Sequence, residues 1–135
     1  MLFVCVKNGG KSQMAAGLMR QAAGELVTVD SADTAPGTSI NALSAEVLHE
    51  VGVDITDQHP QAVTDDLLRA ADVVVVLGRD AQLPPVEGTR LVTWDTDEPS
   101  ERGIDGIERM RLVRDDIAAR TRALAAELGA AEQTG

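Results

Sequence analysis

The chain has 135 residues, enough for one compact domain with a core of its own. Hydrophobic residues make up 44% and aromatic residues 1%, so we expect a core of Val, Leu, Ala, Ile and Met. The formal net charge of −10 argues against nucleic acid or an anionic membrane surface as a partner, because both bind basic surfaces. Any anion site must therefore be built locally, from backbone N–H groups and a few cations.

The sequence also bears on the compartment and on metal binding. No apolar run is long enough to span a membrane and the N-terminus lacks a signal-peptide layout, so we expect a cytoplasmic protein. The single cysteine, Cys5, excludes an internal disulfide and a cysteine-based metal cluster. His49 and His59 do not have the spacing of metal ligands. We expect no metal site and no bound cofactor.

The chain begins with a short apolar run, Leu2–Val6, which is typical of a buried parallel strand. Ser12 is then expected to cap a helix whose apolar residues recur at helical spacing as far as Gly24. Leu26–Val29 is predicted to be the second strand. The segment after it, from Ser31, is predicted to be a loop.

Two helices are expected before the third strand. Asn41–Val51 is predicted to be a helix closed by Gly52, and Thr64 is predicted to cap a short helix that runs through Arg69. Val73–Leu77 is the strongest strand signal in the chain, because four β-branched residues stand in a row.

The last third of the chain is predicted to hold a strand, an acidic loop and a long helix, at Leu91–Trp94, Asp95–Gly106 and Ile107–Leu128, and then a frayed tail over residues 129–135.

Strands that alternate with helices predict a single α/β domain over residues 1–135, with three layers: a four-stranded parallel sheet and helices on both faces. Ligands of such sheets bind beyond the carboxyl ends of the strands. The loops after the first and fourth strands are therefore expected to meet over one site.

The stretch CVKNGGKS, residues 5–12, predicts an anion-binding loop with a thiol at its mouth. The N–H groups of a Gly-rich turn that runs into a helix N-terminus can surround an oxyanion. Lys11 adds a positive charge and Ser12 a hydrogen-bond donor, and we expect both to lower the pKa of the Cys5 thiol. A Cys5 thiolate would be a nucleophile toward phosphorus or arsenic. The expected oxyanion-binding residues are Val6, Lys7, Asn8, Gly9, Gly10, Lys11 and Ser12.

Other interpretations of this stretch stay open. A cysteine at the end of an apolar strand is more often a small buried hydrophobic residue, although such a residue does not need Gly-Gly-Lys-Ser after it. The phosphate-binding loop of nucleotide hydrolases, G-x-x-x-x-G-K-[ST], matches at Gly10–Ser12, but Cys5 stands where its first Gly belongs. Asn8 is expected to fix the turn, whereas Lys7 is as easily a solvated loop residue.

The spacing Cys-x5-basic-Ser after a first strand resembles the C-x5-R-[ST] loop of the low-molecular-weight phosphatase superfamily, and most closely its arsenate reductase branch. Ser31–Thr34 is similar to that branch's Ser-Ala-Gly-Thr loop, and Arg109–Ile117 to the Arg-rich start of its final helix. The resemblance covers nearly the whole chain and implies a low-molecular-weight phosphatase-like (flavodoxin-like) fold. Glu98, which precedes Pro99, is similar to the family's general acid, which protonates the leaving oxygen.

Neighbouring carboxylates keep the identity of the acid open, because Asp95 and Asp97 lie in the same loop as Glu98. Two positions depart from the family pattern. Lys11 stands where Arg is expected, and it offers a point charge in place of a planar fork. Asp33 stands where Gly is expected, and we have no physical account of its effect from the sequence.

The resemblance also bears on the source of electrons. Thioredoxin-coupled reductases of this branch have two further cysteines, which this chain lacks, so an external thiol is expected. Asn-Gly-Gly-Lys-Ser resembles the single-cysteine actinobacterial arsenate reductases that use mycothiol. This implies an arsenate-mycothiol transferase: arsenate binds in the loop with phosphate as a competing ligand, mycothiol is the co-substrate, and a mycoredoxin reduces the adduct to release arsenite.

Two further classes of function remain as alternatives: a low-molecular-weight (protein tyrosine) phosphatase and a non-catalytic oxyanion binder. Lys11 and the absence of any Tyr count against the phosphatase. The acid before Pro99 and the thiol beside the loop count against the binder. Whether Cys5 attacks arsenic covalently or positions it as a thiolate is left open by the sequence.

Overall fold

A computed structural model of the protein describes residues 1–5, 11–24, 27–33, 42–55, 61–77, 88–96 and 99–134. Its elements in chain order are β1 (Leu2–Cys5), α1 (Lys11–Ala23), β2 (Asp30–Asp33), α2 (Ala42–His49), α3 (Asp65–Ala70), β3 (Val73–Leu77), β4 (Arg90–Trp94), the 3-10 helix η2 (Pro99–Arg102) and α4 (Gly106–Thr134).

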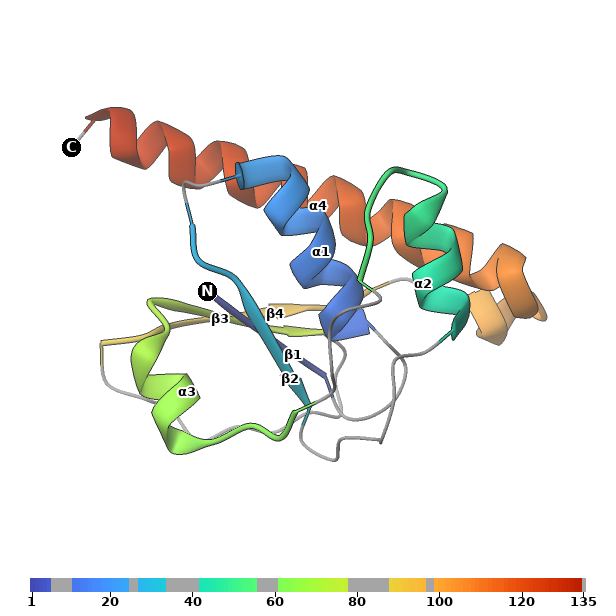
Figure 1. Ribbon diagram of the computed structural model, residues 1–135, viewed down its shortest axis with the longest axis horizontal. Coiled ribbons are helices and arrows are strands. Elements are labelled where there is room, and N and C mark those ends of the chain that lie inside the picture. Colours follow the sequence, from blue (N-terminus) through green and yellow to red (C-terminus); the bar gives the residue numbers. More distant parts are fainter. Residues whose placement is uncertain are drawn as a thin grey trace.

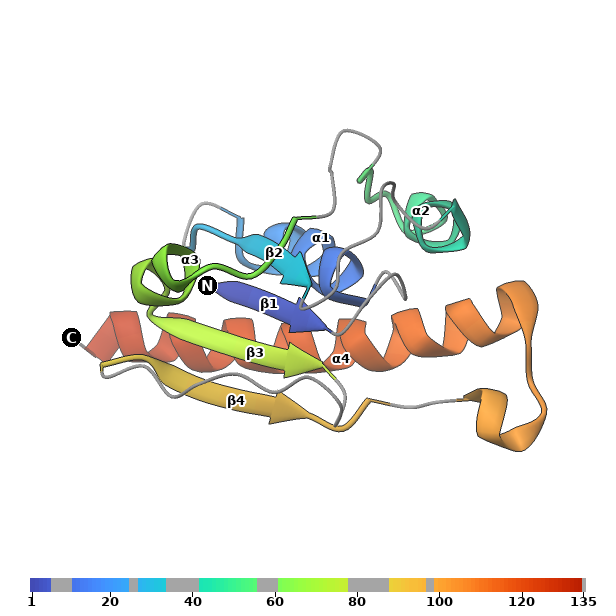
Figure 2. The ribbon, with the colours of Figure 1, turned by 90° about the horizontal axis from the view of Figure 1, so that it is seen from below.

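The four strands form one parallel sheet in the order β2-β1-β3-β4, and all their carboxyl ends lie at the same edge (Figure 2). Helices α1 and α4 cover one face of the sheet and α3 covers the other (Figure 1). Helix α2 packs against α4 and α1, not against the sheet. The predicted fold class, a three-layer α/β domain with a four-stranded parallel sheet, is confirmed.

The side chains of β1 alternate between two buried clusters, as the period of a strand requires. Phe3 and Cys5 belong to the larger cluster, beneath α1 and α4, whereas Leu2 and Val4 belong to the smaller one, with Leu68 of α3. Because both faces of the sheet are covered, its inner strands are apolar along their whole length, and this is why they are readable from sequence.

Several local predictions are confirmed. Thr64 caps α3, and its hydroxyl accepts a hydrogen bond from the Leu67 amide at 3.1 Å. The third strand has the predicted bounds, Val73–Leu77. Gly24, directly after α1, has a φ of 59°, a conformation that favours glycine and ends helices.

The predicted second strand was wrong. The strand that pairs with β1 is Asp30–Asp33, not Leu26–Val29, and it lies in a segment that was expected to be a loop. The strand pairing begins at Asp30, which aligns with Leu2 and whose amide donates to the Met1 carbonyl. Val29 is buried in the larger cluster outside the strand. Pairing with β1 therefore overrides the higher β-propensity of the preceding residues.

Two helix ends also differ from the prediction. Helix α1 begins at Lys11, so Ser12 lies inside its first turn and does not cap it. Helix α4 continues to Thr134 without ending near Leu128, because the Ala- and Glu-rich sequence around Gly129 favours a helix strongly enough to carry it through one glycine. No helix in the described part of the chain is both long and apolar enough to cross a membrane.

Gly17 of α1 lies where a side chain would collide with its neighbours. A Cβ there would stand 2.9 Å from Val53 Cγ1 and 3.0 Å from Ile55 Cγ2, which both belong to the core. We expect Gly17→Ala to lower the free energy of unfolding by about 1 kcal/mol, since overpacking costs about 1–3 kcal/mol and the better helix propensity of Ala returns about 1. Urea unfolding measures the change, and an unchanged or higher midpoint would contradict it.

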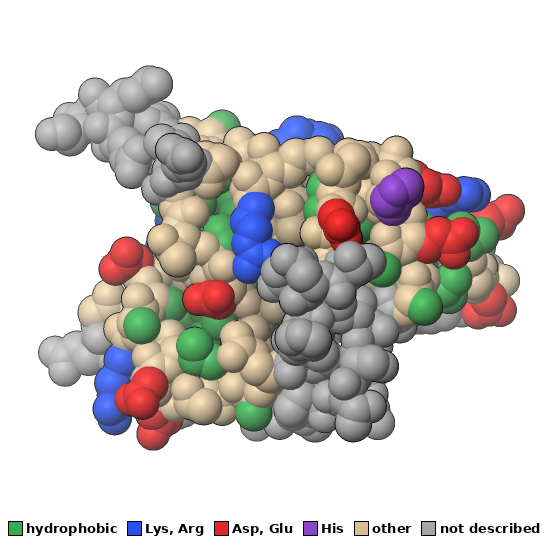
Figure 3. Space-filling model, in the orientation of Figure 1, with side chains coloured by type: hydrophobic (Ala, Val, Ile, Leu, Met, Phe, Trp, Pro, Cys, Tyr) green, Lys and Arg blue, Asp and Glu red, His purple; other side chains and the backbone are tan. Residues whose placement is uncertain are grey.

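An ion-pair cluster joins the end of α2 to α4. Glu50 accepts from Arg111 Nη2 at 2.6 Å and from Arg114 Nη1 at 2.8 Å, and Arg114 also donates to the Val47 carbonyl. Figure 3 shows acidic and basic side chains mixed at this end of the molecule. These hydrogen bonds, Arg111's first, lower the pKa of Glu50 from 4.5 to about 2.

The lowered pKa of Glu50 predicts a pH dependence of stability. A carboxylate whose pKa is lower in the folded state stabilises the fold above its ordinary value of 4.5, and this contribution is lost as the pH falls toward about 2. We expect the stability advantage of the wild type over Glu50→Gln to shrink across this interval, measured by urea unfolding at a series of pH values. The exposed Asp72→Asn is the control, and parallel curves for wild type and Glu50→Gln would contradict the prediction.

Candidate active site

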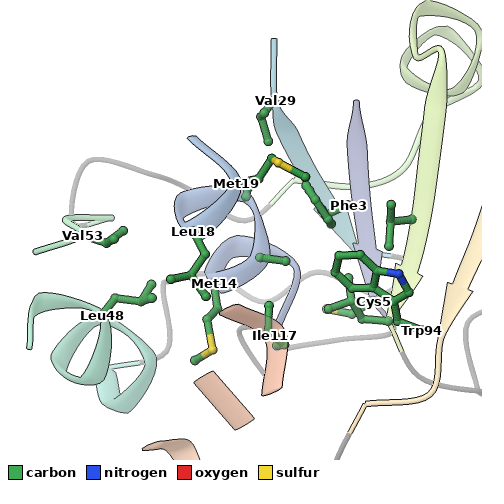
Figure 4. Close-up of a cluster of buried hydrophobic side chains, with 14 of the residues drawn as sticks. Phe3, Cys5, Met14, Leu18, Met19, Val29, Leu48, Val53, Trp94 and Ile117 are labelled. Carbon is green, nitrogen blue, oxygen red and sulfur yellow. The ribbon is translucent and has the colours of Figure 1, made fainter. Parts of the chain in front are cut away.

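Cys5 and Asp33 end neighbouring parallel strands and lie side by side. The register of β1 with β2 aligns their Cα atoms, Cys5↔Asp33. Their side chains point to the face covered by α1, where both are nearly inaccessible, with exposed fractions of 4% and 5%. Figure 4 shows Cys5 near Trp94, whose ring also packs on Phe3 with centroids 5.7 Å apart. The thiol therefore combines an apolar surrounding with one buried carboxylate.

Three side chains converge at this point. Cys5 Sγ lies 2.9 Å from Asp33 Oδ1 and 3.3 Å from Ser12 Oγ, and the Ser12 hydroxyl donates to the same Asp33 oxygen at 2.8 Å. Ser12 is 1% exposed, so the whole group is shielded from water. The Ser12 hydroxyl, which lies inside the first turn of α1, thus binds Asp33.

The pKa of the Cys5 thiol is raised from 9.0 to about 12, which makes the expected lowering wrong. Burial is the largest cause, because it disfavours the charged thiolate, and the hydrogen bond to Asp33 acts in the same direction. The hydrogen bonds between Cys5 and Ser12 lower the pKa, as expected, but they are outweighed. In this arrangement the thiol of Cys5 is protonated at neutral pH.

Lys11 connects the start of α1 with the segment directly after β4. Its Nζ donates to Thr96 Oγ1 at 3.3 Å, across 85 positions in the sequence. This contact brings Lys11, in the predicted loop of residues 5–12, to the segment that follows β4, and the sharing of one site by the two loops stays a prediction. Lys11 thus stands at the carboxyl edge of the sheet, close in the chain to Ser12 and beside the acidic segment.

The remaining predicted site residues lie outside the described part of the chain. These are Val6, Lys7, Asn8, Gly9 and Gly10 of the loop, together with Asp97 and the candidate acid Glu98. Their roles stay predictions. Within the described ranges, no three His, Cys, Asp or Glu side chains gather in a way that could hold a metal ion.

Asp33 was not expected beside Cys5. The second strand was predicted too early in the chain, which left Asp33, an acid where glycine is usual in the family, in a loop. Aligning the second strand to end at Asp33, level with Cys5, would have brought the carboxylate to the thiol, because neighbouring parallel strands end at the same edge. Thr96 was missed as well, since a threonine in an acidic loop gives no such signal.

Comparison with known families decides the wider assignment. The family model described as "Low molecular weight phosphotyrosine protein phosphatase" matches residues 1–134. The chain belongs to this family. The predicted resemblance is thereby confirmed over almost the whole length of the chain.

The low-molecular-weight phosphatase relatives that resemble this chain include many arsenate reductases. An arsenate reductase of Brevibacillus brevis is 35% identical over 91% of each chain, and one of Shouchella clausii is 37% identical over 91% of this chain and 92% of its own. Among solved structures, a thioredoxin-dependent arsenate reductase of Corynebacterium glutamicum has a TM-score of 0.81 at 35% identity. The match covers 96% of this chain but 61% of that protein.

Another solved structure, described as an arsenate reductase in the phosphate-binding state, has a TM-score of 0.81 at 27% identity and covers 94% of this chain and 96% of its own. A protein with this fold has thus been solved in a state described as phosphate-binding.

The contact between Asp33 and Cys5 predicts the effect of removing the carboxylate. Asp33→Asn deletes the charge that disfavours the thiolate and leaves only a neutral, weaker acceptor, so we expect the thiol pKa to fall by about one unit or more. Thiolate ultraviolet absorbance measures it, and Cys5 is the chain's only thiol. Asp30→Asn, an exposed position on β2, is the control. An unchanged or higher pKa in Asp33→Asn would contradict the prediction.

Proposed function

We propose that this protein is an arsenate reductase that binds arsenate in the loop of residues 5–12 and transfers it to mycothiol. The observation that carries the proposal is the position of the chain's single thiol. Cys5 ends β1 and α1 begins at Lys11, so the thiol stands beside a helix N-terminus, where anions bind. The curated relatives named arsenate reductases support the choice of anion.

Arsenate would bind between the loop amides and the side chains of Lys11 and Ser12. The Lys11 ammonium lies at the carboxyl edge of the sheet, where it donates a hydrogen bond to Thr96. Phosphate has the same shape and charge and is expected to compete, in agreement with the relative in its phosphate-binding state. The net charge of −10 makes these local donors all the more necessary.

The transfer step is a condensation. A sulfur–arsenic bond forms, an arsenic–oxygen bond breaks, and the oxygen leaves as water after it gains a proton. Cys5 either makes the first bond to arsenic or organises arsenate for direct attack by mycothiol. Glu98 is the proposed acid for the leaving oxygen, with Asp97 and Asp95 as alternatives.

The reduction itself needs an external donor, because this chain has one cysteine and cannot form an internal disulfide. In the proposal a mycoredoxin thiolate attacks the mycothiol sulfur of the adduct. The sulfur–arsenic bond then breaks with its electron pair on arsenic, which gives arsenite and a mixed disulfide. The choice of mycothiol over thioredoxin rests on the resemblance of Asn-Gly-Gly-Lys-Ser to the mycothiol-dependent enzymes. The Corynebacterium glutamicum relative, by contrast, is thioredoxin-dependent. The cytoplasmic location stays a prediction.

A low-molecular-weight phosphatase is the second candidate, favoured by the family match over residues 1–134. Two features count against it. Lys11 replaces the planar guanidinium that grips a phosphoryl group through two parallel hydrogen bonds. The chain also lacks any Tyr that could stack on a phosphotyrosine ring.

The test is turnover with three systems in parallel: arsenate with mycothiol and mycoredoxin, arsenate with a thioredoxin system, and a chromogenic phosphoester. We expect turnover with the mycothiol system alone. Cys5→Ser should reduce it about 1,000-fold or more, as is typical for loss of a group on which catalysis depends. Lys11→Met should raise the KM for arsenate about tenfold or more, the loss expected for one hydrogen bond from a charged group.

The other outcomes are distinct. Turnover with thioredoxin alone would keep the reductase and overturn the mycothiol assignment. Phosphoester turnover alone would make the protein a phosphatase. Tight arsenate binding without turnover in any system would make it an oxyanion binder.

A further inference from the structure

We propose that Asp33 is the general base for Cys5, and that its carboxylate accepts the thiol proton as the sulfur attacks the oxyanion. The inference deepens the proposed function and rests on it for the identity of the substrate. Its geometric basis, however, lies entirely in described residues at the ends of β1, β2 and the start of α1.

The hydrogen bonds around Asp33 identify it as an acceptor. Oδ1 of Asp33 lies 2.9 Å from Cys5 Sγ and 2.8 Å from Ser12 Oγ. A thiol has one proton to donate, and between a hydroxyl at 3.3 Å and a carboxylate at 2.9 Å the charged acceptor makes the stronger bond. The resting pair is therefore a thiol hydrogen-bonded to a carboxylate, with one proton and one negative charge between them.

Other groups around the thiol are poor proton acceptors. The Ser12 hydroxyl already gives its own proton to Asp33, and Lys11 is a cation that donates to Thr96. On the other side of β1, strand β3 contributes only valines and a leucine. Among the described residues that face Cys5, Asp33 is thus the acceptor in contact with the sulfur. The raised pKa of the thiol makes such an acceptor necessary, because few molecules ionise spontaneously at neutral pH.

Asp33 balances the protons of a two-step transfer. In the first step the S–H bond breaks, Asp33 takes the proton, the sulfur electron pair forms the S–As bond, and one arsenate oxygen leaves as water with a proton from the carboxylic acid proposed for the acidic loop. In the second step an external thiol attacks arsenic and gives its proton to that carboxylate. Cys5 leaves and recovers its proton from Asp33. Arsenic stays pentavalent in both steps, so no oxidant or reductant is required.

Ser12 acts in this scheme as a positioning residue. At rest its hydroxyl donates to Asp33, which leaves the carboxylate oxygen fixed toward the sulfur. When Asp33 becomes protonated it needs that hydrogen bond less, and the Ser12 hydroxyl, 3.3 Å from Sγ, can turn to the negative sulfur. The same transfer neutralises Asp33, which removes the repulsion between its carboxylate and the bound oxyanion.

The experiment uses the full chain and a neutral electrophile, so that it does not depend on arsenate. Alkylation of Cys5 by iodoacetamide is monitored by mass spectrometry as a function of pH, and the chain has no other cysteine to complicate the mass change. A thiol that passes its proton to Asp33 reacts at a rate independent of pH through the neutral range. Asp33→Asn, which cannot accept a proton, reacts only as free thiolate, and its rate rises tenfold per pH unit. Asp30→Asn, on the same strand, should behave as the wild type.

If Asp33→Asn fails to fold, the wild type is tested by its alkylation profile together with its thiolate ultraviolet absorbance, because a resting thiolate also alkylates at a rate independent of pH. A flat profile without thiolate absorbance at neutral pH would support the proposal. A rate that rises tenfold per pH unit, or a flat profile with thiolate absorbance at neutral pH, would overturn it.

Turnover of arsenate provides a second test of Asp33 as the base. We expect Asp33→Asn to lower kcat about 100-fold, the lower end of the usual contribution of general base catalysis, even though its thiolate fraction is higher. A kcat equal to or above that of the wild type would overturn the proposal. A flat profile that is lost in Asp33→Asn, in a protein that does not turn over arsenate, would instead keep Asp33 as the base and refute the proposed substrate.

Discussion

The register between β1 and β2 is the constraint on which the site depends. Because Cys5 pairs with Asp33, the two strands end at the same level and their last side chains share the face beneath α1. A shift of one residue would turn Asp33 to the opposite face and leave the thiol without its partner. The apolar run of β1, buried on both sides, holds this register in place.

The site therefore differs in its resting state from the activated thiolate that the loop sequence suggests. Burial and one carboxylate outweigh the serine that favours ionisation, and the pKa of Cys5 rises to about 12. A protonated, nearly inaccessible thiol resists adventitious oxidation, because the thiolate is the reactive form. The protein would then expose a nucleophile only when proton transfer to Asp33 and attack on the substrate occur together.

The sequence was sufficient to predict a helix or strand where one or both of its faces are buried. Val73–Leu77 was predicted to the residue because a central strand must be apolar throughout, and Thr64 because a cap depends on local hydrogen bonds. The family was recognised from the Cys-x5-basic-Ser motif, and the match over residues 1–134 confirms it. Asp30–Asp33 was missed because it lies at the edge of the sheet and is polar, so only its partner β1 reveals it. The thiol pKa depended on that same non-local pairing and was predicted in the wrong direction.

The protonation state of Cys5 at neutral pH is the most direct test of this account. Only Cys5 can contribute an S–H stretching band to the infrared spectrum, since no other thiol exists in the chain. We expect the band to be present at neutral pH, to be displaced by the hydrogen bond to a carboxylate, and to move toward the position of a weakly bonded thiol in Asp33→Asn. Absence of the band in the wild type at neutral pH would show a resting thiolate and contradict the protonated state of Cys5.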